Sequence, residues 1–230
     1  MTDLHTHILP CMDDGAQSVE EALEMLRMQA RQGVDTVALT PHFYRSREKI
    51  EDFLARRQNA WDRLQDAVKN QDYPQLLLGA EVAWVSGIAD WQELESFCYA
   101  GTRMLLIELP MTPWNQEVFR QLYNLEGRRG VIPMIAHLDR YFHCQKKKMI
   151  EQLLEMGYPV QVSAEALFHT FERKQALHLI EDADALLISD CHNLKERKPN
   201  LESAMKMVEK RLGSYAARLA AENTDDILKD

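Results

Sequence analysis

The sequence predicts an α/β fold in which seven parallel strands, each with its helix, form a closed or nearly closed (β/α)7 barrel. Short apolar runs alternate with amphipathic stretches along the 230 residues, which indicates repeated βα units. Histidines and carboxylates follow six of these runs. Because 46% of the residues are hydrophobic, the chain can bury a sizeable core, and we expect a single domain over residues 1–230.

The N-terminal half supplies three of the predicted strands. The first is expected at residues 2–4. A capping box, Ser18 with Glu21, then begins a helix with an apolar stripe, and Gly33 ends it. The β-rich run at residues 34–40 is the second strand. The remaining elements of this half are a helix at residues 48–69 and a strand at residues 76–80.

The C-terminal half repeats the same alternation. Gly130 and Gly157 each follow an amphipathic stretch and predict the end of a helix. The predicted strands are residues 104–109, 131–136, 160–163 and 185–189. The predicted helices are residues 115–129, 146–156 and 173–182, and the chain is expected to be helical from residue 201 onward.

Charge and composition exclude several classes of protein. The net charge of −9 argues against a nucleic-acid partner, since phosphate backbones attract basic surfaces. The N-terminal residues contain no basic region and no apolar run of signal length, and no apolar stretch reaches about 20 residues, so we expect no signal peptide and no membrane insertion. The four cysteines are scattered without a disulfide framework, which favours a reducing cytoplasm.

The polar residues at the strand ends favour a barrel over an open sheet. In a parallel barrel, the carboxyl ends of all strands converge on one face, where barrel enzymes carry out their chemistry. An open sheet would spread the same residues along a line. The residues concerned are His5, His7, His42, Glu81, Glu108, His137, Asp190 and His192.

Each of these motifs also has a purely structural interpretation. His5 and His7 are two residues apart, so on an extended strand their side chains point the same way and can hold one ion. Asp13-Asp14-Gly15 is equally typical of a turn. Glu108 is more informative, because a carboxylate inside an apolar strand is costly unless it is paired or bound to metal.

Taken together, the histidines and carboxylates predict a metal site. Mixed nitrogen and oxygen donors suit zinc, manganese or iron, whereas oxygens alone would suit magnesium or calcium. The candidates are too numerous for one ion, so at least two are expected. Sites of this kind activate water and stabilise both attacking and leaving oxygens in phosphoryl transfer.

The motifs together resemble the polymerase-and-histidinol-phosphatase (PHP) superfamily. The resemblance rests on His5-Thr-His7, Thr40-Pro41-His42, Gly79-Ala80-Glu81, Ile135-Ala136-His137 and Ser189-Asp190-Cys191-His192-Asn193. Within that superfamily the chain is similar to the bacterial capsule-biosynthesis tyrosine phosphatases, for which Asp14 and Glu108 are diagnostic. This resemblance runs over nearly the whole chain and implies a distorted, TIM-like (β/α)7 barrel, the PHP fold.

The resemblance also implies a residue for each role. Two or three divalent ions are expected, Mn²⁺ first, with iron or zinc as alternatives. The first ion would be bound by His5, His7, Glu81 and Asp190. The second would share Glu81 and add Glu108 and His137, and the third would use Asp14, His42 and His192. Arg140 and Arg197 match arginines that contact the phosphate and its leaving group.

The implied activity is hydrolysis of phosphotyrosine by a metal-activated hydroxide, in the regulation of capsular or exopolysaccharide synthesis. The implied partner is an autophosphorylating bacterial tyrosine kinase. Three alternatives stay open: a small-molecule phosphatase of the histidinol-phosphate type, a nuclease or proofreading module, and a non-catalytic metal-binding module in capsule assembly. Whether the chain forms a homo-oligomer also stays open.

Cys191 and Arg197 present a competing motif. Their Cys-x5-Arg spacing is the signature of cysteine-dependent tyrosine phosphatases. That chemistry needs a glycine-rich loop whose backbone N–H groups bind phosphate, and residues 192–196 contain no glycine. We therefore expect Cys191 to be a passive neighbour of Asp190.

Overall fold

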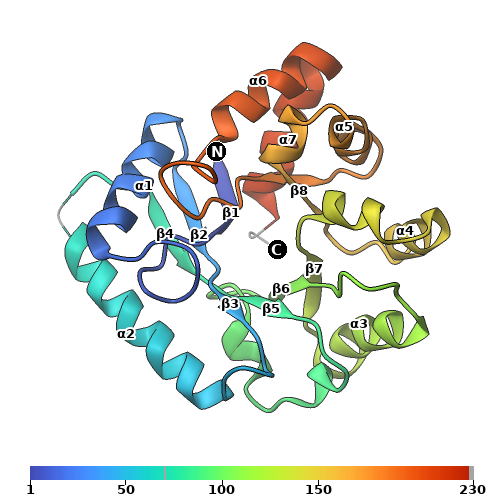
Figure 1. Ribbon diagram of the computed structural model, residues 1–230, viewed down its shortest axis with the longest axis horizontal. Coiled ribbons are helices and arrows are strands. Elements are labelled where there is room, and N and C mark those ends of the chain that lie inside the picture. The colour runs from blue at the N-terminus through green and yellow to red at the C-terminus, as the bar shows by residue number, and fades with distance from the viewer. Residues whose placement is uncertain (70, 228–230) are drawn as a thin grey trace.

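The computed structural model describes residues 1–69 and 71–227 as an α/β fold built on parallel strands. Figure 1 shows the strands inside and helices α1 to α6 around them. The helices are α1 (Val19–Arg31), α2 (Ile50–Val68), α3 (Gln116–Arg129), α4 (Lys147–Leu154), α5 (Glu172–Asp182), α6 (Leu201–Leu212) and α7 (Ser214–Asp226). Four short 3-10 helices accompany them: η1 (Ile88–Asp90), η2 (Leu94–Phe97), η3 (Leu138–His143) and η4 (Ala164–Phe168).

The strands form three sheets in which every pairing is parallel. The first sheet has the order β1 (Thr2–Thr6), β2 (Thr36–Leu39) and β4 (Gln75–Leu78). The second has the order β3 (His42–Phe43), β5 (Glu81–Ala83), β6 (Met104–Glu108) and β7 (Ile132–Ile135). The third pairs β8 (Gln161–Ser163) with β9 (Leu186–Ile188).

Isolated parallel bridges connect the third sheet to the other two. Thr6 pairs with Cys191, and Ile135 pairs with Val160. The backbone N–H of Asp190 also donates to the carbonyl of His5. The predicted α/β fold with parallel strands is thus confirmed, whereas the hydrogen bonding divides the strands into three sheets and does not itself establish a closed barrel.

The predicted helix ends agree well with the structure. The Ser18 side chain accepts a hydrogen bond from the Glu21 backbone, as expected of an N-cap, and Gly130 ends α3 in the left-handed conformation. The predicted C-terminal helix is interrupted at Gly213, which separates α6 from α7.

Two of the predicted strands are shorter in the structure, and each is followed by a further short strand. The run at residues 34–40 becomes β2, and β3 follows after Pro41, which has no N–H for a strand ladder. Similarly, β4 ends before Gly79, and β5 begins at Glu81. The sequence did not predict β3 and β5, because they are too short to show a strand pattern. These breaks turn His42 and Glu81 toward the same region.

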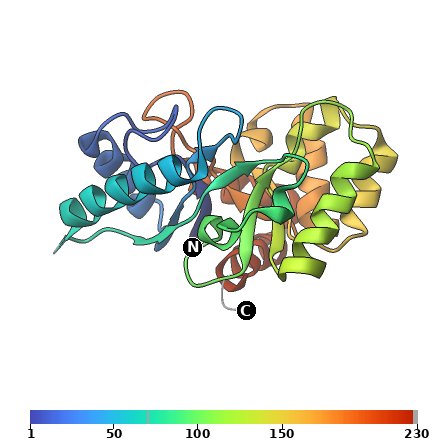
Figure 2. The same ribbon diagram turned by 90° about the horizontal axis from the view of Figure 1, so that it is seen from below.

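The strands separate two apolar cores. The larger core lies between the strands and the surrounding helices. A second cluster includes Leu4, Leu106, Met134 and Ile188, of which the last three alternate along their strands with residues of the first core. Helix α7 packs against β1 and β9, and Figure 2 shows it on the same side as the N terminus. The opposite, carboxyl ends of the strands remain available for the polar residues.

Candidate metal centre

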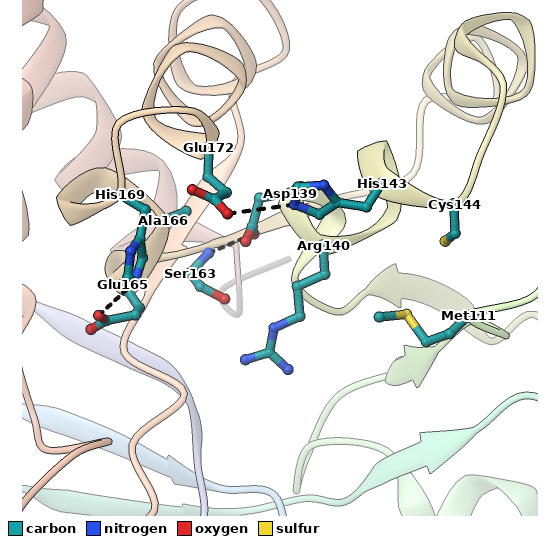
Figure 3. A pocket seen from close by; sticks show the side chains of 10 residues that line it. All are labelled: Met111, Asp139, Arg140, His143, Cys144, Ser163, Glu165, Ala166, His169 and Glu172. Carbon is teal, nitrogen blue, oxygen red and sulfur yellow. Dashed lines mark hydrogen bonds and ion pairs between the residues drawn. The ribbon is translucent and has the colours of Figure 1, made fainter.

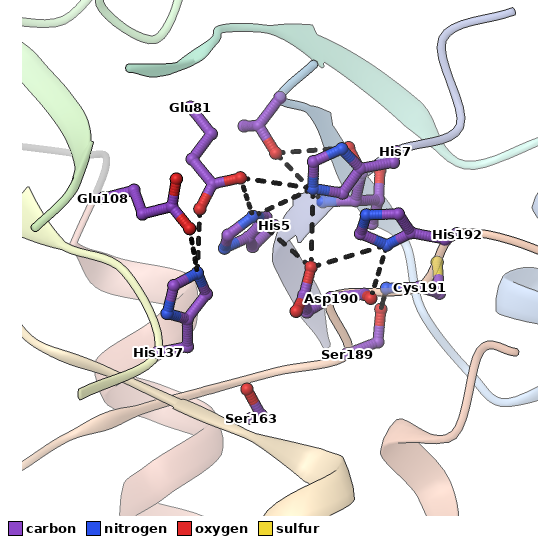
Figure 4. A network of polar contacts seen from close by, with 12 residues as sticks. His5, His7, Glu81, Glu108, His137, Ser163, Ser189, Asp190, Cys191 and His192 are labelled. Carbon is purple, nitrogen blue, oxygen red and sulfur yellow. Dashed lines mark hydrogen bonds and ion pairs between the residues drawn. The ribbon is translucent and has the colours of Figure 1, made fainter. Parts of the chain in front are cut away.

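The structure brings all nine predicted metal ligands together at the carboxyl ends of the strands. Figure 4 shows His5, His7, Glu81, Glu108, His137, Asp190 and His192. Within the described residues, the donor atoms of seven of these ligands form three overlapping groups, each with its atoms within 4.8 Å of one another, whereas His137 and Asp190 are in none of the groups. The groups are His5 with His7 and Glu81; His42 with Glu81 and Glu108; and His7 with Asp14, His42 and His192.

Hydrogen bonds fix the orientation of three histidine rings. The Nδ1 atom of His5 lies 2.8 Å from the side-chain oxygen of Gln161, and Nδ1 of His7 lies 2.7 Å from Asp13 Oδ2. Nδ1 of His192 lies 3.0 Å from the carbonyl oxygen of Asp190. Each of these oxygens accepts, so each Nδ1 carries the proton and leaves Nε2 as the donor atom for a metal.

The free Nε2 atoms face the interior of the site. Nε2 of His5 and Nε2 of His7 are 3.2 Å apart. Nε2 of His192 is buried without a hydrogen-bond partner among the described residues, and it lies 3.5 Å from Asp14 Oδ1. Convergent imidazole nitrogens next to carboxylates are a donor set that fits divalent transition-metal ions.

Glu81 is the central carboxylate. Its side chain is 1% exposed, and Oε2 lies 2.8 Å from His42 Nδ1, 3.2 Å from His5 Nε2 and 3.4 Å from His7 Nε2. Its other oxygen, Oε1, is 2.9 Å from His137 Nε2. Because the two oxygens face different histidines, Glu81 is placed to bridge two ions.

Asp190 lies between the histidines and the two predicted arginines. Its Oδ1 atom is 3.6 Å from His5 Nε2 and 3.4 Å from His7 Nε2, whereas Oδ2 contacts Arg140 and lies 2.8 Å from an Arg197 nitrogen. The structure therefore places both arginines at the edge of the cluster. Their side chains are 35% and 37% exposed, so they also face solvent.

His42, Glu108 and Asp14 occupy the rest of the site. Nε2 of His42 is 3.7 Å from Asp14 Oδ1, and His137 Nε2 is 3.9 Å from Glu108 Oε1. The second group of donor atoms contains His42, whereas the resemblance implies that His137 joins Glu81 and Glu108 there. The difference arises because His42 and His137 approach opposite oxygens of Glu81.

Two residues of the site have strained backbone. His137 has a φ angle of +31° and Asp190 of +51°, in the left-handed region that non-glycine residues rarely adopt. Such conformations cost on the order of 1–3 kcal/mol and are concentrated at functional sites. Each residue lies two positions after the end of a short strand, where the turn directs its side chain into the cluster.

The central carboxylates are ionised at neutral pH. Burial by itself raises the pKa of Glu81, but electrostatic attraction to His5 and hydrogen bonds from the histidines outweigh it and hold the pKa well below its usual value. The pKa of Asp190 is likewise lowered, because Arg140 and His5 offset its burial. Ionised carboxylates are the form that binds cations.

Asp13 is a positioning residue that sequence reasoning did not assign. Besides His7, it accepts hydrogen bonds from the backbone N–H groups of His42 and Gly15, at 2.8 and 2.9 Å. Burial raises its pKa, but His7 and these donors lower it to about 2. The only sequence signal is its place beside Asp14, which is equally typical of a turn.

We expect Asp13→Asn to weaken metal binding by about 10- to 100-fold, because a carboxylate that fixes a ligating histidine strengthens the ligand. The dissociation constant can be measured by competition with a chromophoric chelator. Asp52→Asn is the matched control, since Asp52 is exposed on α2. Equal dissociation constants for the wild type and Asp13→Asn would exclude this role.

Cys191 is buried away from solvent. It has no exposed surface, and its sulfur lies 3.6 Å from Gln29 Nε2. Burial, together with the nearby Asp3 carboxylate, raises the pKa of the thiol well above its usual value, which is the opposite of what a nucleophilic cysteine requires. The geometry thus argues against thiol chemistry.

We expect Cys191→Ser to retain most of the hydrolytic activity, since Gln29 can also hydrogen-bond a hydroxyl. His137→Ala should lose nearly all activity, because it removes a donor next to Glu81. Steady-state kinetics and metal content would be measured for both variants. An inactive Cys191→Ser protein with normal metal content would favour a cysteine nucleophile instead.

Comparison with known proteins identifies the family of the chain. Residues 1–229 match the family described as "Capsular polysaccharide synthesis, CpsB/CapC". The chain is 30% identical to the tyrosine-protein phosphatase YwqE of Bacillus subtilis, over 100% of this chain and 92% of that protein. It is 31% identical to the tyrosine-protein phosphatase CpsB of Streptococcus pneumoniae, over 100% and 99% of the two proteins.

A solved structure supports the same relationship. It comes from a study of YwqE and CpsB as "unique metal-dependent tyrosine phosphatases", matches with a TM-score of 0.83 at 30% identity, and covers 100% of this chain and 94% of its own. The resemblance to capsule-biosynthesis phosphatases inferred from the motifs is therefore confirmed. The chain belongs to the CpsB/CapC family of capsular polysaccharide synthesis.

Proposed function

We propose that this chain is a metal-dependent protein-tyrosine phosphatase that acts in capsular polysaccharide synthesis. The observation that carries the proposal is the set of Nε2 atoms from His5, His7 and His192, which converge beside ionised Glu81 and Asp190. The relatives YwqE and CpsB are tyrosine-protein phosphatases, which indicates the substrate class. A site of this kind suits phosphate ester hydrolysis.

We assign the ligands in the three sets that the resemblance implies, although the group of donor atoms around Glu108 has His42 in place of His137. His5, His7, Glu81 and Asp190 would hold one ion, Glu81 with Glu108 and His137 a second, and Asp14 with His42 and His192 a third. Mn²⁺ is the proposed metal, with iron or zinc as alternatives. Bound ions would activate water near neutral pH and neutralise charge on the phosphate oxygens.

Arg140 and Arg197 would bind and orient the phosphate. A guanidinium makes planar, paired contacts with phosphate oxygens, and both groups lie beside Asp190 at the edge of the cluster. They would also stabilise the negative charge that grows in the transition state. Tyrosine has a pKa near 10, so phenolate leaves more readily than an alkoxide, and a strong general acid is unnecessary.

For the fold, we propose that the three sheets are parts of one distorted (β/α)7 barrel of PHP type, formed by the whole chain as a single domain. The bridges Thr6–Cys191 and Ile135–Val160 support this proposal, because they lie where the sheets would join. The second apolar cluster also supports it, since residues of β1, β6, β7 and β9 all contribute to it.

The proposed substrate is a phosphotyrosine protein, specifically an autophosphorylating bacterial tyrosine kinase, and the proposed location is the cytoplasm. Within the part of the chain that the structure describes, no helix is long and apolar enough to cross a membrane. A co-purification assay with a phosphorylated kinase domain, using an inactive variant as bait, would test the partner.

We expect chelation to abolish hydrolysis of an aryl phosphate, because the donor atoms of the site are placed to bind cations. Treatment with EDTA followed by desalting should remove activity, and a series of divalent ions should restore it, with Mn²⁺ the most effective. Retention of full activity by protein with no measurable metal would rule out the proposed chemistry.

Substrate profiling separates the alternatives. A phosphatase of the histidinol-phosphate type would show a higher kcat/KM on amino-alcohol phosphates than on phosphotyrosine peptides. A non-catalytic module would bind metal without turning over either substrate. A nuclease would instead cleave oligonucleotides and bind them in a salt-dependent manner.

A further inference from the structure

A cavity of about 330 Å³ opens beside the metal centre, on the side of Arg140. Figure 3 shows Arg140 on one wall, Glu165, His169 and Glu172 on another, and Met111 on a separate segment. Arg140 belongs both to this wall and to the edge of the cluster, where it contacts Asp190. A group bound in the cavity would therefore lie next to a phosphate at the metal centre.

Ser163 indicates that the cavity accepts a polar ligand. The residue is 2% exposed and lines the cavity, and its hydroxyl has no hydrogen-bond partner among the described residues. The backbone N–H of Ser163 is already engaged with Asp139 Oδ1 at 2.8 Å. An unpartnered buried hydroxyl is costly, so a ligand or water is expected to complete it.

The charge of the cavity is negative at its outer end. Glu165 and Glu172 line it with side chains 50% and 31% exposed. Glu165 lies 3.0 Å from His169 and accepts a hydrogen bond from the Asn200 side chain at 3.3 Å, and Glu172 lies 3.5 Å from His143. Each carboxylate has further acceptor positions. The one guanidinium in the wall, that of Arg140, is already bound to Asp190. A positively charged group would be favoured there.

Apolar side chains border the same region. Met111 lines the cavity and is 53% exposed. Phe171, next in sequence to Glu172, is 85% exposed, and Phe168, next to His169, is 37% exposed. Large exposed apolar side chains around a polar cavity are typical of surfaces that bind peptides.

We propose that this cavity is a specificity subsite that binds a lysine or arginine side chain close to the phosphotyrosine of a peptide substrate. The ammonium or guanidinium group would lie between Glu165 and Glu172, with its alkyl chain against Met111. The proposal rests on the proposed phosphatase function and deepens it, because it names a sequence feature of the substrate.

The test uses a set of phosphotyrosine peptides, each of which differs from the others at one position. Each position from three residues before to three residues after the phosphotyrosine carries lysine, alanine or glutamate in turn. The wild-type protein should show a kcat/KM about five- to tenfold higher for lysine than for glutamate at one or more positions, and the preference should shrink as salt is added. Glu165→Gln/Glu172→Gln should lose this preference. Its activity on p-nitrophenyl phosphate should be unchanged, because that substrate has no flanking residue.

The matched control is Glu51→Gln/Glu209→Gln, which removes the same charge from exposed positions on α2 and α6 and should keep the preference. Binding of peptides that carry a non-hydrolysable phosphonate in place of the phosphate gives a readout independent of turnover.

Equal kcat/KM and equal affinity for lysine and glutamate peptides would overturn the subsite while leaving the phosphatase function intact. A loss of p-nitrophenyl phosphate activity in the Glu165/Glu172 variant would also overturn it. Failure of the metal-loaded protein to hydrolyse any aryl phosphate or phosphopeptide would instead overturn the proposed function.

Discussion

Glu81→Gln is expected to lower kcat/KM for an aryl phosphate by roughly a thousandfold or more, and to lower the amount of bound metal. Glu81 is almost fully buried, and four histidines lie within 2.8–3.4 Å of its two oxygens. Glutamine has the same shape but no charge, and one of its terminal atoms is an N–H donor. The substitution therefore keeps the packing and removes the negative charge that two ions would share.

Steady-state kinetics and elemental analysis of the purified protein would measure both effects. Glu108→Gln makes the same chemical change at the edge of the cluster, where the side chain is 21% exposed, and should cause a smaller loss. Glu209→Gln, on the exposed face of α6, should change neither quantity. A Glu81→Gln protein with normal metal content and normal kinetics would remove Glu81 from the proposed centre.

Arg140→Ala is expected to lower kcat by about a hundredfold while the metal content stays the same. The side chain follows His137 by three residues, lies on η3 and contacts Asp190 from the solvent side. A phosphate at the cluster would meet this guanidinium directly. If the arginine stabilises the transition state, its loss should reduce turnover more than metal binding.

Arg140→Lys provides the matched control for charge. Lysine keeps the positive charge but cannot make paired, planar contacts, so only part of the lost rate should return. Parallel measurements of kcat, metal content and thermal unfolding would separate catalysis from stability. A decrease in metal content equal to the decrease in kcat would show that Arg140 acts only by holding Asp190. Full recovery by lysine would show that charge alone is needed.

Local signals in the sequence were sufficient for most of the elements and for the ligand residues. The Ser18 cap and the left-handed Gly130 depend on neighbouring residues only, so their sequence patterns determine them. Glu108 was recognisable because a carboxylate in an apolar strand needs a partner. The positions of the histidines and carboxylates after the strands also predicted that these side chains would lie close together, since parallel strands bring their carboxyl ends to one face.

The arrangement of these residues around one another was decided by the tertiary structure. The sequence does not encode locally that His42 and His137 approach opposite oxygens of Glu81, or that Asp13 holds the ring of His7. These contacts join strands far apart in the chain, and they depend on the kinks after β2 and β4 that no propensity pattern reveals.

Cys191 illustrates the same division. Its spacing to Arg197 is a property of the sequence, but spacing does not determine which way the sulfur faces. The left-handed backbone of Asp190 and the bridge between Thr6 and Cys191 bury the thiol beside Gln29 and leave the Asp190 carboxylate in the cluster. Residue types and short-range patterns thus determined the helices, the strands and the side chains that could bind metal. Strand pairing and packing between distant segments determined which of these side chains meet, because such contacts depend on the whole chain.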